Sequence, residues 1–390
     1  GVCGGSRSAG SPASGGTWSS SNISIASVTN AGLVTGITEG TATFTYTNSA
    51  TGCSSTTTPV TIHPVPLATI TSAGVSICNN GGNTLITGTV TANGNWLLTL
   101  SNGATATGTG NGSFSISVSP VISTLYTIAS LVDENCSALA GGLTGSTFVT
   151  VNEPVNITTQ PASSQTICSS FPVSFSVAAT GTGLNYQWYL GATPLTDNAN
   201  ISGSNTAVLN IAQAALADAG TYRVEISATA PCSAVFSDDA VLTVIQDIEI
   251  INQPVTEVKC AGATASFTVN ASGAGLSYQW RRGAATLTDG GRISGANTAT
   301  LVITNVNAGD AATNYNVVIS GAGGICPQSI STDVTLIVNP IPDAVALPVY
   351  QTTCSEVNIT SIQFTGAVPA TTFNWVRDNP GVTGTIGNSG

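Results

Sequence analysis

The chain has 390 residues, and 6% of them are charged, against roughly 25% in an average soluble domain. Its 7 basic and 18 acidic residues give a formal net charge of −11, which argues against nucleic acid or an anionic membrane as a partner. No apolar run reaches the roughly 18 residues that a spanning helix needs, so we expect no membrane insertion in this segment.

Cysteines and tryptophans recur in a fixed order along the chain. Each tryptophan follows a cysteine at a similar interval, and in the first four units a tyrosine and a second cysteine come next. The residues of this pattern are Cys3, Trp18, Tyr46, Cys53, Cys78, Trp96, Tyr126, Cys136, Cys168, Trp188, Tyr222, Cys232, Cys260, Trp280, Tyr315, Cys326, Cys354 and Trp375. The repeated order predicts domains at 1–64, 65–152, 153–245 and 246–338, and a partial unit at 339–390.

The first domain, 1–64, contains Thr17-Trp-Ser-Ser-Ser-Asn22, Ala31-Gly-Leu-Val-Thr-Gly36 and Gly40-Thr-Ala-Thr43. Apolar residues alternate with polar ones between glycine turns, which predicts short strands. These motifs resemble the bacterial Ig-like group 2 family, and the resemblance implies a β-sandwich.

The second domain, 65–152, has its third strand at Asn95–Leu100, around Trp96. Its ending, Ser123 to Cys136, resembles the T-Y-T-L-x-S-V-x-D-x-x-C ending of surface adhesin repeats in the Bacteroidota. Asp133 and Glu134 in this ending offer carboxylates for a structural Ca²⁺. Because no D-x-D-x-D-G loop accompanies them, we favour a solvated turn and expect no cofactor.

The third and fourth domains, 153–245 and 246–338, are near-copies with a period of 92 residues: Tyr186-Gln-Trp188 matches Tyr278-Gln-Trp280. A tryptophan in the third strand and a tyrosine at the start of a late strand are typical of immunoglobulin-like sandwiches. All five tryptophans and the four tyrosines of the pattern are therefore predicted core residues. Tyr189 and Arg281 should face outward and are the candidate surface-contact residues. The tyrosine-corner motif is stretched between Asp310 and Tyr315, which predicts an altered corner there.

The fifth unit, 339–390, resembles a PKD-like repeat, with Cys354, Phe364-Thr-Gly-Ala-Val-Pro369 and Trp375. It has no tyrosine strand and no second cysteine. Half a sandwich cannot bury its apolar face alone, so we expect the chain to be a piece of a longer array.

The cysteine order predicts one disulfide in each domain: Cys3–Cys53, Cys78–Cys136, Cys168–Cys232 and Cys260–Cys326, with Cys354 unpaired in this segment. Disulfides at this density indicate an oxidising compartment, and hence an exported, extracellular protein. No C-x-x-C is present and His63 is the single histidine, so we expect no metal site.

Together the units resemble the giant Ig-like and PKD-like repeat adhesins of the Bacteroidota, including the gliding-motility adhesin type. The resemblance implies export through the type IX pathway and display at the cell surface. We therefore expect an all-β, extended rod of Ig-like sandwiches that serves as a stalk or filament shaft for attachment or motility. Its expected partners are neighbouring domains, copies of the same protein in a fibre, and surface glycans, a host or another substratum.

The alternative is a carbohydrate-binding module array of a secreted polysaccharide-degrading protein, which would need a strip of exposed aromatic side chains. An enzyme is not expected. The chain has one histidine and one lysine, Lys259, and we find no nucleophile elbow or phosphate-binding loop, so no catalytic residue is assigned.

Overall fold

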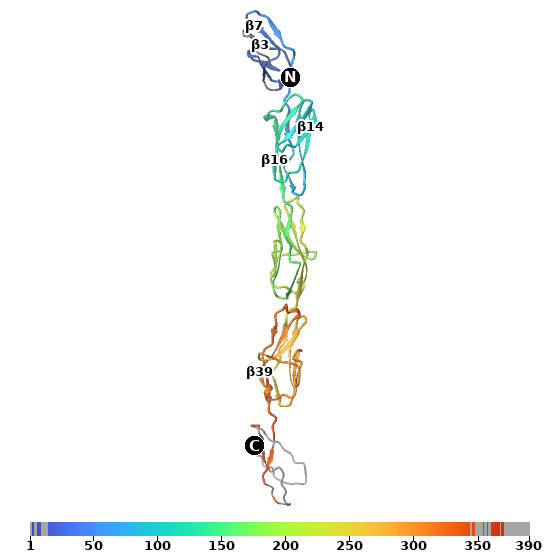
Figure 1. The fold of residues 1–390 in the computed structure, drawn as a ribbon, viewed down its shortest axis with the longest axis vertical. Coiled ribbons are helices and arrows are strands. Elements are labelled where there is room, and N and C mark those ends of the chain that lie inside the picture. The colour runs from blue at the N-terminus through green and yellow to red at the C-terminus, as the bar shows by residue number, and fades with distance from the viewer. Residues whose placement is uncertain are drawn as a thin grey trace.

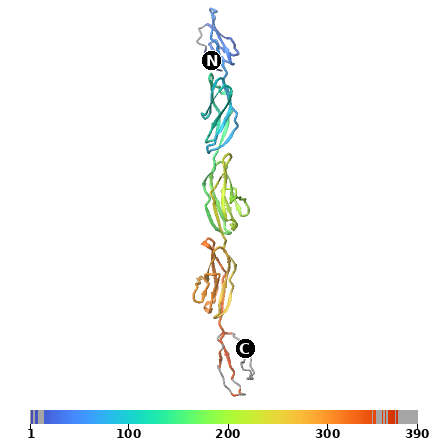
Figure 2. The ribbon, with the colours of Figure 1, turned by 90° about the vertical axis from the view of Figure 1, so that its right-hand side faces the viewer.

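The computed structural model describes residues 2–3, 6–8, 15–343, 345–347, 354, 357, 360–366 and 368–369. The chain forms a rod in which sandwich domains follow one another end to end (Figure 1). The rod keeps this shape when it is turned by 90° (Figure 2). Four separate clusters of buried apolar side chains lie along it, and each cluster falls inside one of the four predicted domain ranges. We call these domains one to four in chain order.

Domain one has three small sheets around Ala26, Val34, Ala42, Phe44 and Ile62. The sheets have the strand orders β1-β9-β6, β2-β5-β4 and β3-β7-β8. The strands are β1 (Val2–Cys3), β2 (Ser6–Ser8), β3 (Gly16–Ser20), β4 (Ala26–Val28), β5 (Leu33–Gly36), β6 (Gly40–Ala42), β7 (Phe44–Asn48), β8 (Ser54–Thr56) and β9 (Val60–His63).

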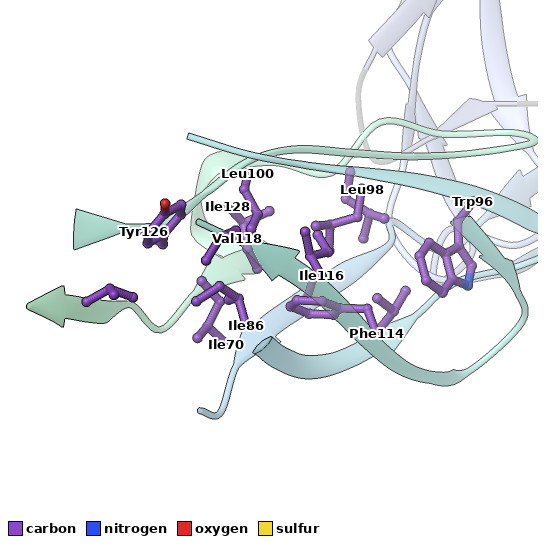
Figure 3. Close-up of a cluster of buried hydrophobic side chains, with 14 of the residues drawn as sticks. Ile70, Ile86, Trp96, Leu98, Leu100, Phe114, Ile116, Val118, Tyr126 and Ile128 are labelled. Atoms are coloured by element: carbon purple, nitrogen blue, oxygen red, sulfur yellow. The ribbon is translucent and has the colours of Figure 1, made fainter. Parts of the chain in front are cut away.

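Domain two has sheets β15-β12-β10-β18, β11-β19-β16 and β14-β13-β17. Its elements are β10 (Leu67–Ile70), β11 (Val75–Cys78), β12 (Thr84–Thr91), β13 (Asn95–Leu100), β14 (Thr105–Thr109), β15 (Gly112–Val118), β16 (Thr124–Tyr126), β17 (Ile128–Asp133), the 3₁₀ turn η1 (Ala140–Gly142), β18 (Leu143–Thr144) and β19 (Thr147–Asn152). Trp96 and Tyr126 lie toward opposite ends of its buried cluster (Figure 3).

Domains three and four repeat one topology: β21-β30-β28-β24-β25 matches β32-β41-β39-β35-β36, and two smaller sheets match as well. The elements of domain three are β20 (Asn156–Thr159), β21 (Ser164–Cys168), β22 (Val173–Ser176), β23 (Ala178–Thr180), β24 (Asn185–Leu190), β25 (Thr193–Pro194), β26 (Ile201–Ser202), β27 (Val208–Ile211), η2 (Leu216–Asp218), β28 (Gly220–Ser227), β29 (Val235–Phe236) and β30 (Ala240–Ile245).

Domain four is followed by a short hairpin, β42 (Val345–Leu347) with β43 (Gln363–Thr365). The elements of domain four are β31 (Glu249–Asn252), β32 (Glu257–Cys260), β33 (Ala265–Thr268), β34 (Asn270–Ser272), β35 (Ser277–Arg282), β36 (Ala285–Thr286), β37 (Ile293–Ser294), β38 (Thr300–Ile303), η3 (Ala308–Asp310), β39 (Ala312–Ser320), η4 (Ala322–Gly324), β40 (Ser329–Ile330) and β41 (Val334–Asn339).

The core of domain three is an aromatic cluster that the alternating strand pattern aims inward. Trp188 is fully buried, and its Nε1 donates to Thr206 O at 2.9 Å. Phe175 stacks on Tyr222 with ring centroids 4.7 Å apart. Phe267, Trp280 and Tyr315 repeat this arrangement in domain four. Two apolar side chains, Phe175 and Val224, fill places where an antibody domain carries its inter-sheet cysteines.

The predicted burial of aromatic residues is confirmed for Trp96, Trp188, Trp280, Tyr126, Tyr222 and Tyr315, each at most 5% exposed. Trp18 and Tyr46 are half-buried instead, and their rings lie 5.3 Å apart. Domain one has a smaller buried cluster than the others, which leaves this pair at its edge. Trp375 lies outside the described residues.

The tyrosine corner of domain four is altered in its backbone, as predicted, but its hydrogen bond is kept. Tyr222 OH donates to Asp218 O at 2.7 Å, and Tyr315 OH donates to Asp310 O at the same distance. The additional residue is absorbed by an irregularity in the pairing of β39 with β41, between Ala312 and Tyr315. A bulge of this kind accommodates one extra residue in a strand and leaves it outside the regular pairing.

Domain four adds an ion pair to its corner. Arg292 holds Asp310 through two hydrogen bonds, of 2.5 and 3.0 Å, and Asp310 Oδ2 also accepts from Asn307 N at 2.8 Å. These contacts, led by the guanidinium, hold the pKa of Asp310 below its ordinary value. In domain three the equivalent positions are Asp218 and the uncharged Asn200.

Because the pKa of Asp310 is lower in the folded chain, its contacts stabilise domain four above the unfolded pKa, and this contribution disappears as the pH falls through the folded value. We expect acidification below about pH 4 to destabilise domain four, and Asp310→Asn to remove much of this loss. Asp218→Asn, at the equivalent position of domain three, serves as the matched control. Hydrogen exchange resolved by domain and measured across this pH range checks it; an unchanged acid sensitivity of domain four in Asp310→Asn would contradict it.

Candidate functional site

The first cysteine of every domain ends a strand that runs parallel to the last strand of that domain. We call β1, β11, β21 and β32 the lead strands, and β9, β19, β30 and β41 the final strands. In each pair the last residues are partners: Cys3 with His63, Cys78 with Asn152, Cys168 with Ile245, and Cys260 with Asn339. Each lead-strand cysteine therefore lies at the far end of its domain, next to the following one.

The second cysteine of each domain lies at the opposite end. Cys53, Cys136, Cys232 and Cys326 come in the turns after β7, β17, β28 and β39. In domain three, β28 is antiparallel to the final strand β30. The turn after β28 consequently lies where the final strand begins, at the end that faces the preceding domain.

The predicted pairing within domains was wrong. The structure instead joins consecutive domains through Cys3–Cys136, Cys78–Cys232 and Cys168–Cys326, while Cys53 and Cys260 are free. A final strand of six residues, such as β30 (Ala240–Ile245), spans roughly 20 Å. The two cysteines of one domain are at opposite ends of such a strand, whereas a disulfide needs Cα atoms within about 7 Å. Across the junctions the Cα–Cα distances are 5.1 to 5.5 Å.

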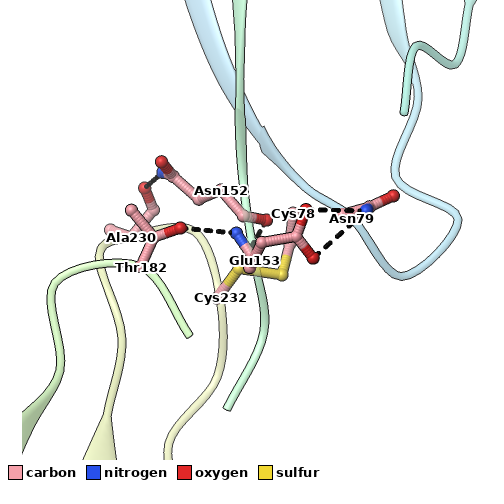
Figure 4. Close-up of a disulfide and its surroundings, with 7 residues drawn as sticks. All are labelled: Cys78, Asn79, Asn152, Glu153, Thr182, Ala230 and Cys232. Atoms are coloured by element: carbon pink, nitrogen blue, oxygen red, sulfur yellow. Dashed lines mark hydrogen bonds between the residues drawn. A yellow bond between two sulfur atoms is a disulfide. The ribbon is translucent and has the colours of Figure 1, made fainter. Parts of the chain in front are cut away.

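The junction between domains two and three shows how the bridge is supported (Figure 4). Asn152 Nδ2 donates to Ala230 O of domain three at 2.8 Å, and Asn79 Nδ2 donates to Glu153 Oε1 at 2.9 Å. Glu153 N in turn donates to Thr182 Oγ1 at 2.8 Å. Side chains and backbone of both domains thus fix the connector beside the disulfide, which limits bending at this point.

The junction between domains three and four is held in a similar way. Asp247 N donates to Ser169 Oγ at 2.9 Å, next to the bridge of Cys168 and Cys326. The Asp247 carboxylate lies within 4.8 Å of both sulfurs. Because the two sulfurs are bonded to each other, they are not thiolate ligands, and we assign no metal to this group.

Asp133 helps to shape the turn that carries Cys136. Its Oδ1 accepts from Asn135 N at 2.9 Å and from Cys136 N at 2.6 Å, and its Oδ2 accepts from Asn93 N at 3.0 Å. The side chain of Glu134 accepts from Asn95 Nδ2 at 2.5 Å. The prediction of a solvated turn was wrong for Asp133, which is 7% exposed, because backbone donors of the turn enclose its carboxylate. Its oxygens are used by these donors, so a turn-forming role fits this residue better than Ca²⁺ ligation.

Both candidate contact residues are half-buried. Tyr189 OH donates to Glu225 Oε2 at 2.8 Å, and its ring meets that of Phe236 edge-on, at 62°. Arg281 keeps its Nε buried without a hydrogen-bond partner among the described residues. A carbohydrate platform would need coplanar exposed rings, and the Tyr189–Phe236 pair is not coplanar.

Two of the disulfides and the backbone between them form a short covalent route along the rod. From Cys3 the route crosses to Cys136, follows the backbone to Cys168, and crosses to Cys326. The backbone stretch 136–168 includes the final strand of domain two and the lead strand of domain three, which are already extended. We call this route the load path. The bodies of domains one to three lie largely outside it.

The thiols provide a direct check of the pairing. In the oxidised 390-residue chain by itself, we expect an alkylating reagent to label Cys53, Cys260 and Cys354, because all three are free and exposed there. The six bridged cysteines should react after reduction alone. Peptide mapping by mass spectrometry measures both sets, and a peptide that links Cys168 with Cys232 would contradict the structure.

Comparisons with known proteins agree with this architecture. A family model described as "Bacterial Ig-like domain (group 2)" matches residues 7–59, which confirms the resemblance of domain one. A search of curated protein sequences finds no match. In the described part of the chain, no helix is both long and apolar enough to cross a membrane.

Solved structures of tandem Ig domains are similar to the chain. The titin I-band fragment I67–I69 and a Glu-to-Ala variant of it have TM-scores of 0.52 and 0.53 at 14% and 15% identity, and each likeness covers 70% of this chain and 98% of the titin chain. Immunoglobulin domains 1–5 of Sidekick-1 match 87% of this chain and 78% of their own at 19% identity, with a TM-score of 0.38. The chain is an all-β tandem array of Ig-like sandwiches.

Proposed function

We propose that this protein is a tension-bearing segment of an extracellular adhesin, a stalk or filament shaft whose length is fixed by disulfides between its domains. One observation carries the proposal: each bridge joins the far end of one domain to the near end of the next. A bridge within a domain protects that domain alone, whereas these bridges pass tension from domain to domain through covalent bonds.

The load path explains why such a rod would resist stretching. The route through the bridges contains only the backbone of residues 136–168. The whole backbone from Cys3 to Cys326 is about ten times as long as this stretch. Fully extended, that stretch reaches roughly 110 Å. Because the route already spans domains two and three in the folded rod, unfolding of their other strands releases little length.

Parallel hydrogen bonding in each domain adds a second support. The 5-residue lead strand β21 pairs along its whole length with the final strand β30. The two strands of this pair belong to different covalent routes. The lead strand β21 is part of the load path and ends at the Cys168–Cys326 bridge, whereas the final strand β30 follows Cys232, which is bridged to Cys78. Tension on either route is therefore shared with the other through this ladder.

The finer assignment is a surface adhesin of the Bacteroidota type, exported through an oxidising compartment, with neighbouring domains, copies of the chain or a substratum as partners. Disulfide bridges between folded domains, a low charge content and the Ig-like repeats support this assignment. The test of the tension-bearing role is the extension of single oxidised and reduced chains. Surface display is tested by antibody labelling of intact cells, which should bind this segment without permeabilisation.

A further inference from the structure

We infer that Cys260 is one half of a fourth inter-domain disulfide, whose other half is the turn cysteine of the Ig-like unit that carries Cys354. The inference rests on the proposed function, because it extends the same chain of bridges past domain four. Cys260 is exposed and free, whereas its equivalents Cys78 and Cys168 are 6% and 3% exposed and bridged. What buries those two sulfurs is the turn of the following domain.

The backbone around Cys260 has the geometry of a bridged half. Cys260 pairs with Asn339 at the end of the final strand, as Cys78 pairs with Asn152. The next residue repeats one hydrogen bond at all three places: Asn79 N to Asn152 O at 2.8 Å, Ser169 N to Ile245 O at 2.7 Å, and Ala261 N to Asn339 O at 2.8 Å. Cys260 is therefore already placed as the two bridged cysteines are. The repeated strand-end geometry, rather than the free thiol itself, indicates that the partner of Cys260 is a turn cysteine of the following unit.

Cys354 is not that partner, because its position is that of a lead-strand cysteine. It follows Cys260 at nearly the same interval that separates Cys168 from Cys260, and Cys78 from Cys168. The interval from a lead-strand cysteine to the turn cysteine of its own domain is much shorter. It is shortest from Cys3 to Cys53 and longest from Cys260 to Cys326. These limits are 50 residues (53 − 3) and 66 residues (326 − 260). Counted from Cys354, an interval between them gives the place of the cysteine that we assign to Cys260, and this place falls after Gly390.

Cys53 is the complementary half at the other end of the rod. Asn48 N donates to Cys53 O at 2.9 Å, as Asp133 N donates to Cys136 O at 2.8 Å. The Asn48 side chain accepts from Ala50 N and Thr51 N, much as Asp133 accepts from the backbone of its own turn. The turn that carries Cys53 is thus built like the turn that carries a bridged cysteine.

Formation of the bridge is an oxidation, so it needs an electron acceptor. The Cys260 thiol and the turn-cysteine thiol lose two protons and two electrons as their S–S bond forms. The acceptor is a disulfide, either of a thiol oxidoreductase or of a small molecule, and its S–S bond is reduced to two thiols. The oxidising compartment that the three existing bridges require supplies this class of oxidant.

The experiment uses the full-length natural protein, isolated with its free thiols blocked by N-ethylmaleimide and digested without reduction. We expect Cys260 in a disulfide-linked peptide with a cysteine that follows Cys354 within the limits given above. In a Cys260→Ser variant, that partner should become alkylated while the Cys168–Cys326 bridge stays intact. The matched Cys53→Ser variant should leave the Cys260 bridge unchanged.

Three outcomes would overturn the inference: Cys260 recovered as the alkylated thiol, Cys260 bridged to Cys354, or Cys260 bridged to Cys53 of a second copy. None of them touches the proposed function, which depends on the three bridges inside residues 3–326 and is measured by stretching. Conversely, a stretchable segment with a bridged Cys260 would refute the tension-bearing role and leave this inference standing.

Discussion

Stretched between a handle at Gly1 and one in the β39–β40 connection beside Cys326, the oxidised chain should lengthen by no more than a few tens of ångströms, while the reduced chain should lengthen by roughly 1,000 Å. The difference arises because the oxidised route from Cys3 to Cys326 contains only the stretch 136–168, which is already extended, whereas the reduced route contains all the backbone between them. Single-molecule force spectroscopy measures both lengths directly.

Two double variants separate the load path from disulfide content in general. Removal of the middle bridge, by Cys78→Ser with Cys232→Ser, leaves the route through 136–168 intact and should leave the length of the oxidised chain unchanged. When the Cys168–Cys326 bridge is removed, the shortest covalent route runs from Cys136 back along the backbone to Cys78. It then crosses the bridge to Cys232 and follows the backbone to Cys326. That variant should extend to a maximum of about 500 Å.

Each variant lacks one bridge, so a general loss of stability would affect them alike. Equal extension of the two variants would contradict the load path. Steps of about 300 Å in the oxidised wild-type chain, roughly the contour of one freely unfolding domain, would contradict the tension-bearing role itself.

Trp188→Ala should lower the free energy of unfolding of domain three by about 3–5 kcal/mol, the usual cost of removing a buried tryptophan. Trp188 is completely buried between the sheets, contacts Phe175, and donates a hydrogen bond to Thr206 O. An Ig-like domain of this size has a total stability on the order of 5–15 kcal/mol, so the variant should open far more often. Hydrogen exchange resolved by peptide measures this opening.

Domain four provides the internal control for that substitution. Trp280 has the same burial and the same hydrogen bond, to Thr298 O at 2.9 Å, so Trp280→Ala should destabilise domain four and spare domain three. Trp18→Ala should have a smaller effect on domain one, because Trp18 is half-buried and its Nε1 has no partner in the described part of the chain. Equal effects of Trp18→Ala and Trp188→Ala would contradict the burial on which the prediction depends.

The cysteine pairing could have been inferred from the sequence with one further step. The order Cys–Trp–Tyr–Cys recurs four times and suggests a closed unit, which favours bridges within domains. In a sandwich whose lead strand runs parallel to its final strand, however, a cysteine at the end of the lead strand lies at the far end of the domain. Its own turn cysteine is then a full strand length away, and the turn of the next domain is within reach.

The sequence by itself determined the repeat, the strand pattern and the aromatic core, because these depend on local alternation and on short, regular spacings. Tyr186 and Trp188 share a strand face in any sheet, and the fully buried Trp188 follows from this alternation. The tertiary structure alone decided which cysteines meet and whether the corner at Tyr315 survives its insertion. Both depend on how strands that are distant in the sequence are aligned. The partner of a cysteine at the end of a strand is set by the domain that lies beside it, not by its own sequence neighbours.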